Sequence, residues 1–273
     1  MTIDVLGLPA RQPKPRSRGL TVCIDSGLPI SMFQDVIESN GSHLDIVKFG
    51  WGTALVTGKI EQKLDVLRHH GIEFLFGGTL FEKYASRGCV DEYRRLCLDY
   101  GCRLVEISNG TIEMDRDTKG KYIDQFARDF DVFGEVGFKD QPRSELLSPS
   151  QWIEAIESDL HHGAKRVLLE SRESATSGIC RPDGELRIGL IEDILKSDVG
   201  SQNLIFETPT SKLQTYFIKR IGPEVNLGNI GMLDIVPLET LRLGLRSDTL
   251  LAHHDHFEKP PVAPLRGDMQ EKI

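Results

Sequence analysis

Short hydrophobic runs alternate with longer amphipathic stretches along most of this chain. Four of these runs stand alone, at 20–27, 44–50, 131–137 and 203–209, and four more close the segments 68–78, 98–108, 160–171 and 219–229. They are rich in Val, Ile, Leu and Phe, a composition that favours strands buried on both faces. Helical patterns lie between the runs, and we expect helices over 31–40, 59–70, 90–100, 118–129, 150–162, 185–197, 210–221 and 237–245.

Glycines mark where four of the expected helices end. In each case an apolar run starts two or three residues after a glycine that suits the left-handed position closing a helix: Gly71, Gly101, Gly163 and Gly222. Eightfold alternation of strand and helix predicts a (β/α)₈ TIM barrel over residues 19–250, formed as a single domain. A doubly wound open sheet is the alternative, but no GxGxxG fingerprint follows the first strand.

The two ends of the chain differ from the barrel in composition. Residues 1–18 carry four basic side chains and three prolines and lack the apolar region of a secretory signal, so we expect a flexible N-terminal arm. Residues 251–273 contain His253, His254 and His256 before a proline-rich stretch, and we expect a flexible, solvated C-terminal tail. The histidine cluster would bind metal only adventitiously.

Charge and cysteine content narrow the class of protein. The net charge of −8 argues against a nucleic-acid partner, although it permits a local basic pocket for an anionic metabolite. Five scattered cysteines without a CxxC motif indicate reduced thiols and a cytoplasmic location. No apolar run is long enough to span a bilayer, so we expect no membrane partner.

Charged residues fall near the predicted carboxyl ends of the strands, where (β/α)₈ barrels carry their chemistry. Successive strands carry or run into Asp25, Lys48, Glu106, Glu135, Glu170, Glu207 and Asn226, and Lys139 and Arg172 follow closely after two of these. Carboxylates gathered on one rim repel one another unless cations separate them, and a hard cation such as Mg²⁺ does so compactly. Any single one of these residues could instead belong to a buried ion pair that only completes a layer of the barrel.

Glycine-rich segments flank the same strand ends. "FGWGT", "FGGT" and "NLGN", the last of which contains Gly228 and Asn229, would place backbone N–H donors at the mouth of the barrel. They could equally be tight turns. Together with the charges, they predict an enzyme for a small, multiply anionic substrate, with Mg²⁺ as cofactor. The pattern does not name the reaction.

A set of motifs resembles the phosphosulfolactate synthase family. In order, they are "GLTVCIDSG", "DIVKFGWGT", "FGGTLFE", "VEISNGTIEM", "GEVGFKD", "ESRES", "VNLGNI" and "PLETLRLGLRSDT". The likeness runs from about Arg18 to Thr249, nearly the whole predicted barrel. One departure is Thr208, where the family pattern has Ala-Pro after the glutamate of the seventh strand. That departure bears on substrate detail more than on the reaction class.

The resemblance implies a lyase-class (β/α)₈ enzyme that adds sulfite to C3 of phosphoenolpyruvate with Mg²⁺, giving (2R)-phospho-3-sulfolactate. It implies that Lys139 is the general acid, and we expect Lys48 to hold phosphate or sulfite. If Lys139 is partly desolvated, we expect its pKa to be depressed, because an acid works best near the operating pH. We assign the metal to Glu106, Glu135 and Glu170. Substrate binding is assigned to Asp25, Arg172, Glu207, Asn226, Gly228, Asn229 and Arg242. Arg242 could equally be an ordinary surface ion-pair partner.

Three alternatives stay open at this stage. Lys48 could form a Schiff base with a carbonyl substrate, as in a class I aldolase, and borohydride trapping would reveal the adduct. The chain could be a non-catalytic, stress-associated or interaction homologue, which loss of the acid or the carboxylates would mark. It could also add a nucleophile other than sulfite. The sequence leaves the oligomeric state open, a homo-oligomer included.

Overall fold

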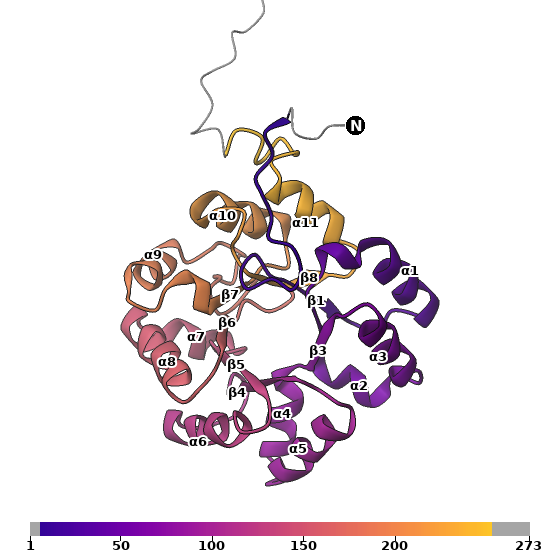
Figure 1. Ribbon diagram of the computed structural model, residues 1–273. Helices are drawn as coiled ribbons and strands as arrows, with labels where there is room; N and C mark the ends of the chain where they lie inside the picture. The colour runs from indigo at the N-terminus through magenta and orange to yellow at the C-terminus, as the bar shows by residue number, and fades with distance from the viewer. Residues whose placement is uncertain (1–5, 253–273) are drawn as a thin grey trace, which may run out of the picture.

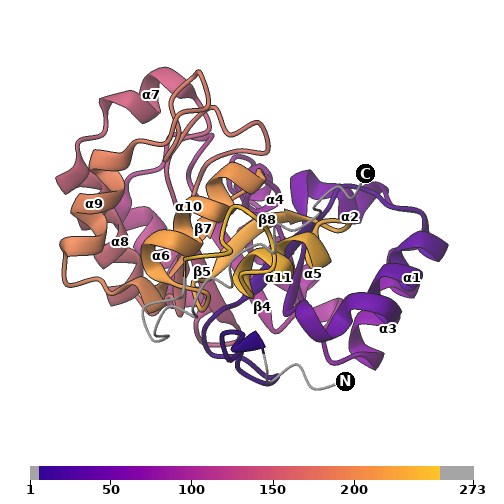
Figure 2. The ribbon, with the colours of Figure 1, turned by 90° about the horizontal axis from the view of Figure 1, so that it is seen from above.

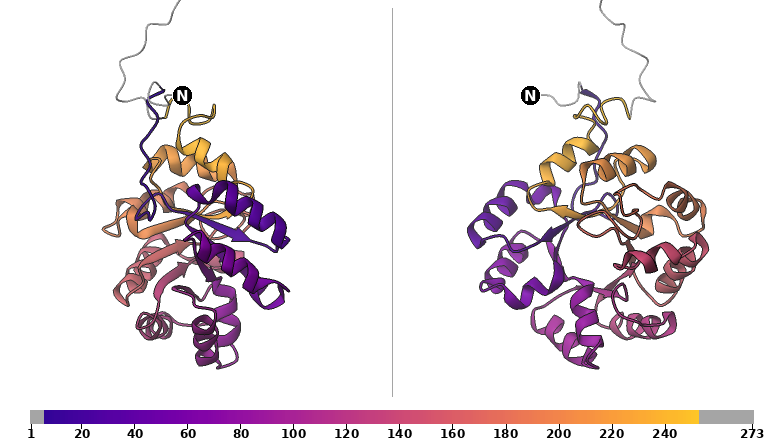
Figure 3. Two further views of the ribbon diagram at one scale, coloured as in Figure 1. Left: turned by 45° about the vertical axis from the view of Figure 1, so that its right-hand side comes forward. Right: turned by 180° about the vertical axis from the view of Figure 1, so that it is seen from behind.

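Eight parallel strands form a ring with helices around it (Figure 1). The computed structural model describes residues 6–252, and the expected barrel is confirmed over them. The strands are β1 Thr21–Asp25, β2 Ile46–Phe49, β3 Glu73–Phe76, β4 Leu104–Ser108, β5 Asp131–Val136, β6 Arg166–Leu169, β7 Leu204–Glu207 and β8 Leu227–Gly231. Because neighbouring strands are parallel, all eight carboxyl ends lie at one end of the ring. The right-hand view of Figure 3 shows the ring from the side opposite to that of Figure 1.

The ring is hydrogen-bonded everywhere except at one seam. The strand order is β3-β2-β1-β8-β7-β6-β5-β4, so within residues 6–252 the backbone ladder does not connect β3 to β4. These two strands still lie next to each other and complete a nearly closed barrel. Side chains, rather than backbone groups, therefore close this seam.

The helices pack around the outside of the ring. Their bounds are α1 Ile30–Asn40, α2 Thr53–Val56, α3 Ile60–His69, α4 Gly78–Ala85, α5 Val90–Asp99, α6 Arg116–Phe126, α7 Gln141–Leu146, α8 Pro149–His161, α9 Ile188–Lys196, α10 Ser211–Ile221 and α11 Ile235–Arg242. Short 3₁₀ helices occur at η2 Gly41–His43, η3 Gly50–Gly52 and η4 Ser201–Asn203. Each of the eight expected helical segments overlaps one of these α-helices. No described helix is both long and apolar enough to cross a membrane.

Three short helices were not expected: α2, α4 and α7. Glycines suggested turns after β2 and β3, yet Gly77 caps α4 and Gly78 is its first residue. The segment that follows the glycines buries Leu80 and Phe81 against the core, which stabilises a helix despite the glycine at its start. Tertiary packing here outweighs the local tendency to form a turn.

Part of the predicted N-terminal arm is anchored to the amino-terminal end of the barrel, at the bottom of Figure 2. Arg11 contacts Glu224 and lies 3.0 Å from Glu239. Lys14 donates to the backbone carbonyl of Gly41, and Arg16 lies 3.0 Å from Asp45. The predicted tail lies outside the described residues except at its start.

Candidate functional site

A layer of charged side chains lies directly above an apolar layer inside the barrel. The apolar layer is a separate cluster formed by Val22, Ile46, Leu75, Leu104, Phe133, Leu168 and Ile205. Side chains two residues apart on a strand share a face. The residues two positions beyond five members of this cluster are Lys48, Glu106, Glu135, Glu170 and Glu207. The strand period therefore places these five polar groups inside the barrel, one step nearer its carboxyl end.

Lys48 lies among three carboxylates. Its Nζ is 2.9 Å from Glu106 Oε2, 3.2 Å from Glu207 Oε1 and 3.6 Å from Glu135 Oε2. Only 6% of Lys48 is exposed. An ammonium this deeply buried is tolerated because carboxylates surround it.

Lys139 is the second cation of this cluster. It forms an ion pair with Glu135, and its Nζ is 2.8 Å from Glu170 Oε2. Its side chain is 22% exposed, compared with 8% for the side chain of Lys48. Lys139 therefore lies at the top of the cluster, where it faces the opening.

The two lysines and four glutamates line one cavity of about 420 Å³ at the carboxyl end. Its wall also includes Gly77, Gly78, Thr79, Arg172 and Asn229. The volume falls in the range typical of small-ligand sites. Figure 2 shows α7 at the top of the molecule, opposite the N-terminal arm. We call this cavity, with these two lysines and four glutamates, the carboxyl-end site.

The carboxylates of the site outnumber its ammonium groups, and their pKa values show the effect. Burial, together with the charge of Glu135, raises the pKa of Glu106 to about 7 despite the opposing effect of Lys48. Burial and the neighbouring carboxylates raise the pKa of Glu207 well above its ordinary value. Burial alone would also raise the pKa of Glu135, but Lys139 and Lys48 hold it below the usual range. The site is therefore short of positive charge.

Both lysines remain cationic in this surrounding. Burial opposes their charge, but Glu106, Glu207 and Glu135 raise the pKa of Lys48 above its ordinary value. Glu135 and Glu170 do the same for Lys139. The expected depressed pKa of Lys139 is therefore wrong for this state of the site, because two carboxylates contact the ammonium and outweigh its desolvation.

Three residues at the rim adopt a left-handed backbone conformation that side chains disfavour: Trp51, Arg172 and Asn229, with φ of 51°, 56° and 54°. All three line the cavity. Such conformations persist where surrounding structure holds them, and they cluster at functional sites. Asn229 is also buried with an Oδ1 that has no hydrogen-bond partner within the described structure.

Asp25 and Gly228 lie near the site but are absent from the cavity wall. Asp25 forms an ion pair with Lys63 of α3, and its other carboxylate oxygen accepts the backbone amides of Gly27 and Leu28. Gly228 pairs with Glu207 in the ladder between β7 and β8. The structure gives Asp25 a role in fixing the loop after β1, and it gives Gly228 a place within the barrel wall.

The expected position of Asn226 at the carboxyl end is wrong, because β8 begins one residue later. Asn226 accepts the amide of Leu20 and donates to the carbonyl of Leu204, at the amino-terminal end. Arg242 is also at this end, fully buried, and donates to the carbonyls of Pro223, Val225 and Leu20. These bonds tie β1 to β8 far from the charged cavity, so neither predicted substrate contact fits. Arg242 is not a surface ion-pair partner either.

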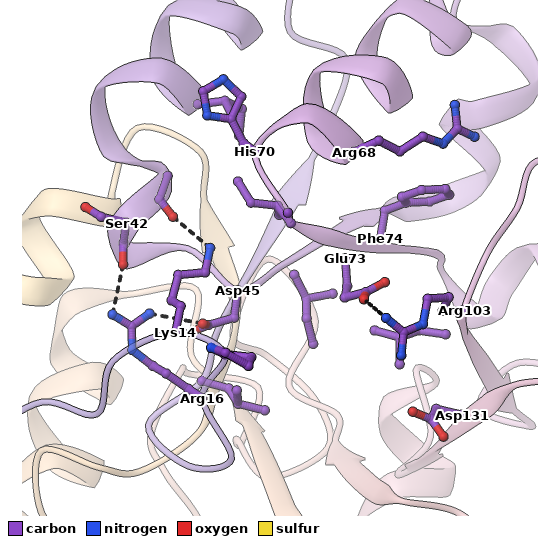
Figure 4. Close-up of a pocket in the computed structure, with 18 of the residues that line it drawn as sticks. Lys14, Arg16, Ser42, Asp45, Arg68, His70, Glu73, Phe74, Arg103 and Asp131 are labelled. Carbon is purple, nitrogen blue, oxygen red and sulfur yellow. Dashed lines mark hydrogen bonds and ion pairs between the residues drawn. The ribbon is translucent and has the colours of Figure 1, made fainter.

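A larger hollow of about 1110 Å³ lies at the amino-terminal end (Figure 4). Much of its charge is already compensated within the protein. Arg16 pairs with Asp45 at 3.0 Å, Arg103 pairs with Glu73 at 2.8 Å, and Lys14 donates to backbone carbonyls. The smaller cavity has concentrated, incompletely balanced charge at the end where barrels carry chemistry, so it is the candidate active site.

Sequence reasoning assigned no site role to Gly78 or Glu82, although it expected backbone N–H donors from the "FGGT" segment. Gly78 donates its amide to Glu106 Oε1 at 2.6 Å, and the glycine-rich motif after β3 was the available signal. Glu82 accepts the amides of Thr111 and Ile112. Nothing in its spacing distinguishes Glu82 from an exposed helical glutamate, although it lies within the "FGGTLFE" motif.

Solved structures share the fold. A 3-hexulose-6-phosphate synthase from Salmonella typhimurium superposes with a TM-score of 0.55 at 12% identity, over 82% of this chain and 99% of that one. A thiamine phosphate pyrophosphorylase from Pyrococcus furiosus gives a TM-score of 0.50 at 10% identity, over 83% of this chain and 95% of that one. At this identity, the likeness concerns the barrel alone.

Sequence relatives are much closer. Phosphosulfolactate synthase of Bacillus subtilis is 48% identical over 244 residues, 89% of this chain and 97% of that protein. The phosphosulfolactate synthase of Methanothermobacter thermautotrophicus is 39% identical, over 89% of this chain and 95% of that protein. A more distant relative, Protein HEAT-STRESS-ASSOCIATED 32 of Arabidopsis thaliana, is 25% identical over 85% of this chain and 88% of that protein. The family model for (2R)-phospho-3-sulfolactate synthase (ComA) matches residues 9–248, and the chain belongs to this family.

Proposed function

We propose that this protein is a phosphosulfolactate synthase that adds sulfite to C3 of phosphoenolpyruvate, giving (2R)-phospho-3-sulfolactate. Membership of the family supports the reaction class, a lyase that forms a carbon–sulfur bond in the synthetic direction. The observation that carries the proposal is the position of Lys48 and Lys139 among four glutamates in one cavity at the carboxyl end. Loss of the acid or of the carboxylates would mark a non-catalytic homologue, and this chain keeps both.

The reaction needs positive charge where the intermediate forms. When sulfite attacks C3, electron density moves into the carboxylate of phosphoenolpyruvate and leaves an aci-carboxylate at C2. This species carries more negative charge than the ground state, so fixed cations stabilise the transition state selectively. Lys48, deep in the cavity and cationic, is placed to hold the carboxylate, phosphate or sulfite anion.

Mg²⁺ fits the donor set of this site. The glutamates offer the oxygen ligands that Mg²⁺ prefers, and they outnumber the two ammonium groups of the cavity. Among residues 6–252, no three acidic, histidine or cysteine side chains already converge as a metal site. Mg²⁺ commonly uses one or two carboxylates with water and substrate oxygens. We therefore keep Glu106, Glu135 and Glu170 as proposed ligands, direct or through water. Bound Mg²⁺ would act as a Lewis acid toward the substrate carboxylate.

Lys139 is proposed to deliver the proton to C2. Its ammonium is at the top of the charged cluster and is the more exposed of the two lysines. Its contacts with Glu135 and Glu170 now make it a weak acid. When those carboxylates share their charge with another cation, the pKa of Lys139 falls and proton donation becomes easier. Arg172, Glu207 and Asn229 line the same cavity and remain proposed substrate contacts.

The cellular setting is also a proposal. All five cysteines lie in the described residues and none forms a disulfide. Reduced thiols are typical of the cytoplasm, which we propose as the location. The substrates are small anions, and no feature described above requires a nucleic-acid or membrane partner.

One experiment tests the proposal directly. Purified protein is incubated with phosphoenolpyruvate, sulfite and Mg²⁺, and phosphosulfolactate is sought by mass spectrometry, with sulfite omitted as the control. Product should form, disappear with EDTA and return with added Mg²⁺. Absence of product in all metal conditions would refute the proposed reaction, and full activity in metal-free buffer would refute the metal requirement.

A second measurement tests the metal without relying on turnover. A cation near the cluster lowers the pKa values of Glu106 and Glu207, so Mg²⁺ binding near pH 7 should release protons. Calorimetric titration with MgCl₂ in buffers of different ionisation enthalpy measures that release. A binding heat that is independent of the buffer would contradict the assignment.

A further inference from the structure

The seam between β3 and β4 is closed by two carboxylates that cross it in opposite directions. Glu106, on β4, accepts the amide of Gly78 at the start of α4. Glu82, on α4, forms the second contact across the seam: its Oε1 accepts a hydrogen bond from Ser108 Oγ at the end of β4. Only 2% of Glu82 is exposed. A buried carboxylate thus substitutes for the backbone ladder at this point.

Glu82 also holds the loop that follows β4. The amides of Thr111 and Ile112 donate to Glu82 Oε2 at 2.7 and 2.9 Å. Its two oxygens therefore accept three hydrogen bonds, and among the described residues no Lys, Arg or His lies within ion-pair distance of it. A carboxylate that accepts several N–H donors holds its surroundings in one geometry.

The held loop is in contact with Lys139. The amide of Lys139 donates to the carbonyl of Gly110 at 3.0 Å. A Cβ added to Gly110 would lie 3.2 Å from Lys139 Nζ, 3.5 Å from Glu135 Oε1 and 3.0 Å from the carbonyl oxygen of Gly137. Gly110 is buried and therefore forms one wall of the space that holds the ammonium. The loop therefore contacts Lys139 twice, at its backbone amide and beside its head group.

We propose that Glu82 is a positioning residue for Lys139. It fixes the 109–112 loop across the open seam, and the loop sets where the ammonium of Lys139 points in the carboxyl-end site. The role of Lys139 as acid rests on the proposed function, but the mechanical link from Glu82 to Lys139 does not. Misplacement of a reacting group by about 1 Å costs roughly 10²-fold in rate, so the link should appear in kcat.

The variants separate positioning from general stability. Glu82→Ala removes all three hydrogen bonds. Glu82→Gln keeps the shape and can still accept both backbone amides, with its NH₂ group directed to Ser108 Oγ. Gly110→Ala leaves Glu82 intact and pushes directly on Lys139. The matched control is Asp45→Ala, which removes a buried carboxylate that accepts the amide of Thr21 at 2.9 Å, at the opposite end of the barrel.

Each full-length variant is assayed for kcat and KM and for thermal stability, and amide hydrogen exchange is followed by mass spectrometry. In Glu82→Ala we expect faster exchange in peptides covering 109–112 and Lys139. We also expect kcat to fall about 10- to 100-fold with KM for phosphoenolpyruvate within a few-fold, because the acid acts only in the transition state. Glu82→Gln should recover most of kcat. Gly110→Ala should lower kcat in the same way, and Asp45→Ala should lose stability with kcat unchanged.

The outcomes are distinct. Faster exchange at 109–112 without a change at Lys139 would overturn the proposal, as would near-normal kcat in both Glu82→Ala and Gly110→Ala. An equal fall of kcat in Asp45→Ala would show a general effect of lost stability and also overturn it. If the wild-type protein makes no product from phosphoenolpyruvate and sulfite, the proposed function fails, and the exchange data alone then decide whether Glu82 positions Lys139. Should Glu82→Ala not fold, Gly110→Ala and Glu82→Gln carry the test.

Discussion

Replacing Lys48 by Met tests whether its charge balances the carboxyl-end site. Methionine has nearly the same length and shape, so the change removes the ammonium with little loss of packing. The closest contact, 2.9 Å to Glu106, corresponds to about 6 kcal/mol of Coulomb attraction at an effective dielectric constant of about 20. Most of this attraction offsets the cost of burying the charges. Breaking a buried pair by removing one partner typically costs about 3–5 kcal/mol, which is the loss we expect at pH 8.

The expected loss depends on pH in a defined direction. Without Lys48, Glu106 and Glu207 lose a counter-charge, and their pKa values rise further above those of the unfolded chain. At pH 5.5 they take up protons and no longer need a cation, so the destabilisation should shrink to less than half. Urea denaturation followed by circular dichroism at both pH values measures the difference. Lys59→Met, at an exposed lysine, is the control and should change stability by less than about 0.5 kcal/mol.

Two results would refute this reasoning. An equal loss of stability at pH 5.5 and pH 8 would mean that the effect comes from packing and not from charge. A loss below about 1 kcal/mol at pH 8 would mean that the carboxylates find other counter-charge. In the activity assay, Lys48→Met should mainly raise KM for the anionic substrates, because Lys48 is proposed to bind them in the ground state.

Three further changes test the remaining assignments. Lys139→Ala should lower kcat by about 10²–10⁴-fold with KM within a few-fold, and a change confined to KM would assign Lys139 to anion binding. Because the pKa of Glu106 is raised from 4.5 to about 7, the folded state binds the extra proton, and this contribution to stability is lost as pH rises from 4.5 through 7. Glu106→Gln should therefore flatten the fall in unfolding free energy over that range; an unchanged slope would contradict the shift. Arg242→Met should cost about 3 kcal/mol or more, since it removes three buried hydrogen bonds donated by a guanidinium, while steady-state assays should show kcat and KM within about twofold.

Much of the barrel, and the charged centre of its site, can be predicted from the two-residue alternation of side chains along each strand. Leu104 and Glu106 lie two apart on one strand, as do Phe133 and Glu135, so a buried parallel strand must place each pair on one face. The ladder pairs Glu106 with Phe133 and Glu135 with Leu168, so the tilt of the strands in a barrel, rather than direct pairing, must bring the polar members together. Lys48 lies on β2, far from the glutamates in the sequence, and it meets them only because the strands curve into a ring. The charge cluster was therefore predictable once the barrel was assumed.

The errors have a different physical origin. Strand boundaries are uncertain by a few residues from sequence, and β8 begins just after Asn226 instead of ending near it, which puts Asn226 at the opposite end of the strand. Arg242 was assigned from its chemistry alone, yet it shares the buried face of α11 with Leu238 and Leu241. That helical spacing would have indicated a buried arginine. For Asp25, the missing partner was Lys63, which lies on the apolar face of α3 beside Leu64 and Leu67. In both α3 and α11, a basic residue on the apolar face of the helix was the sequence signal for a buried cation with a structural role.

The surroundings of Lys48 also decide between two roles for this lysine, Schiff-base formation with a carbonyl substrate and binding of an anion. Schiff-base formation needs a neutral amine as nucleophile, and enzymes obtain one by desolvating lysine or placing a second cation beside it. Here the opposite arrangement is found, because Glu106, Glu207 and Glu135 surround the ammonium and raise its pKa. Protonation of Glu106 near pH 7 weakens one of these contacts, but Glu135, whose pKa is low, keeps its charge. Lys48 therefore stays an ammonium across the physiological range. A permanently charged lysine cannot attack a carbonyl, but it can hold an anion against the carboxylates that would otherwise repel it.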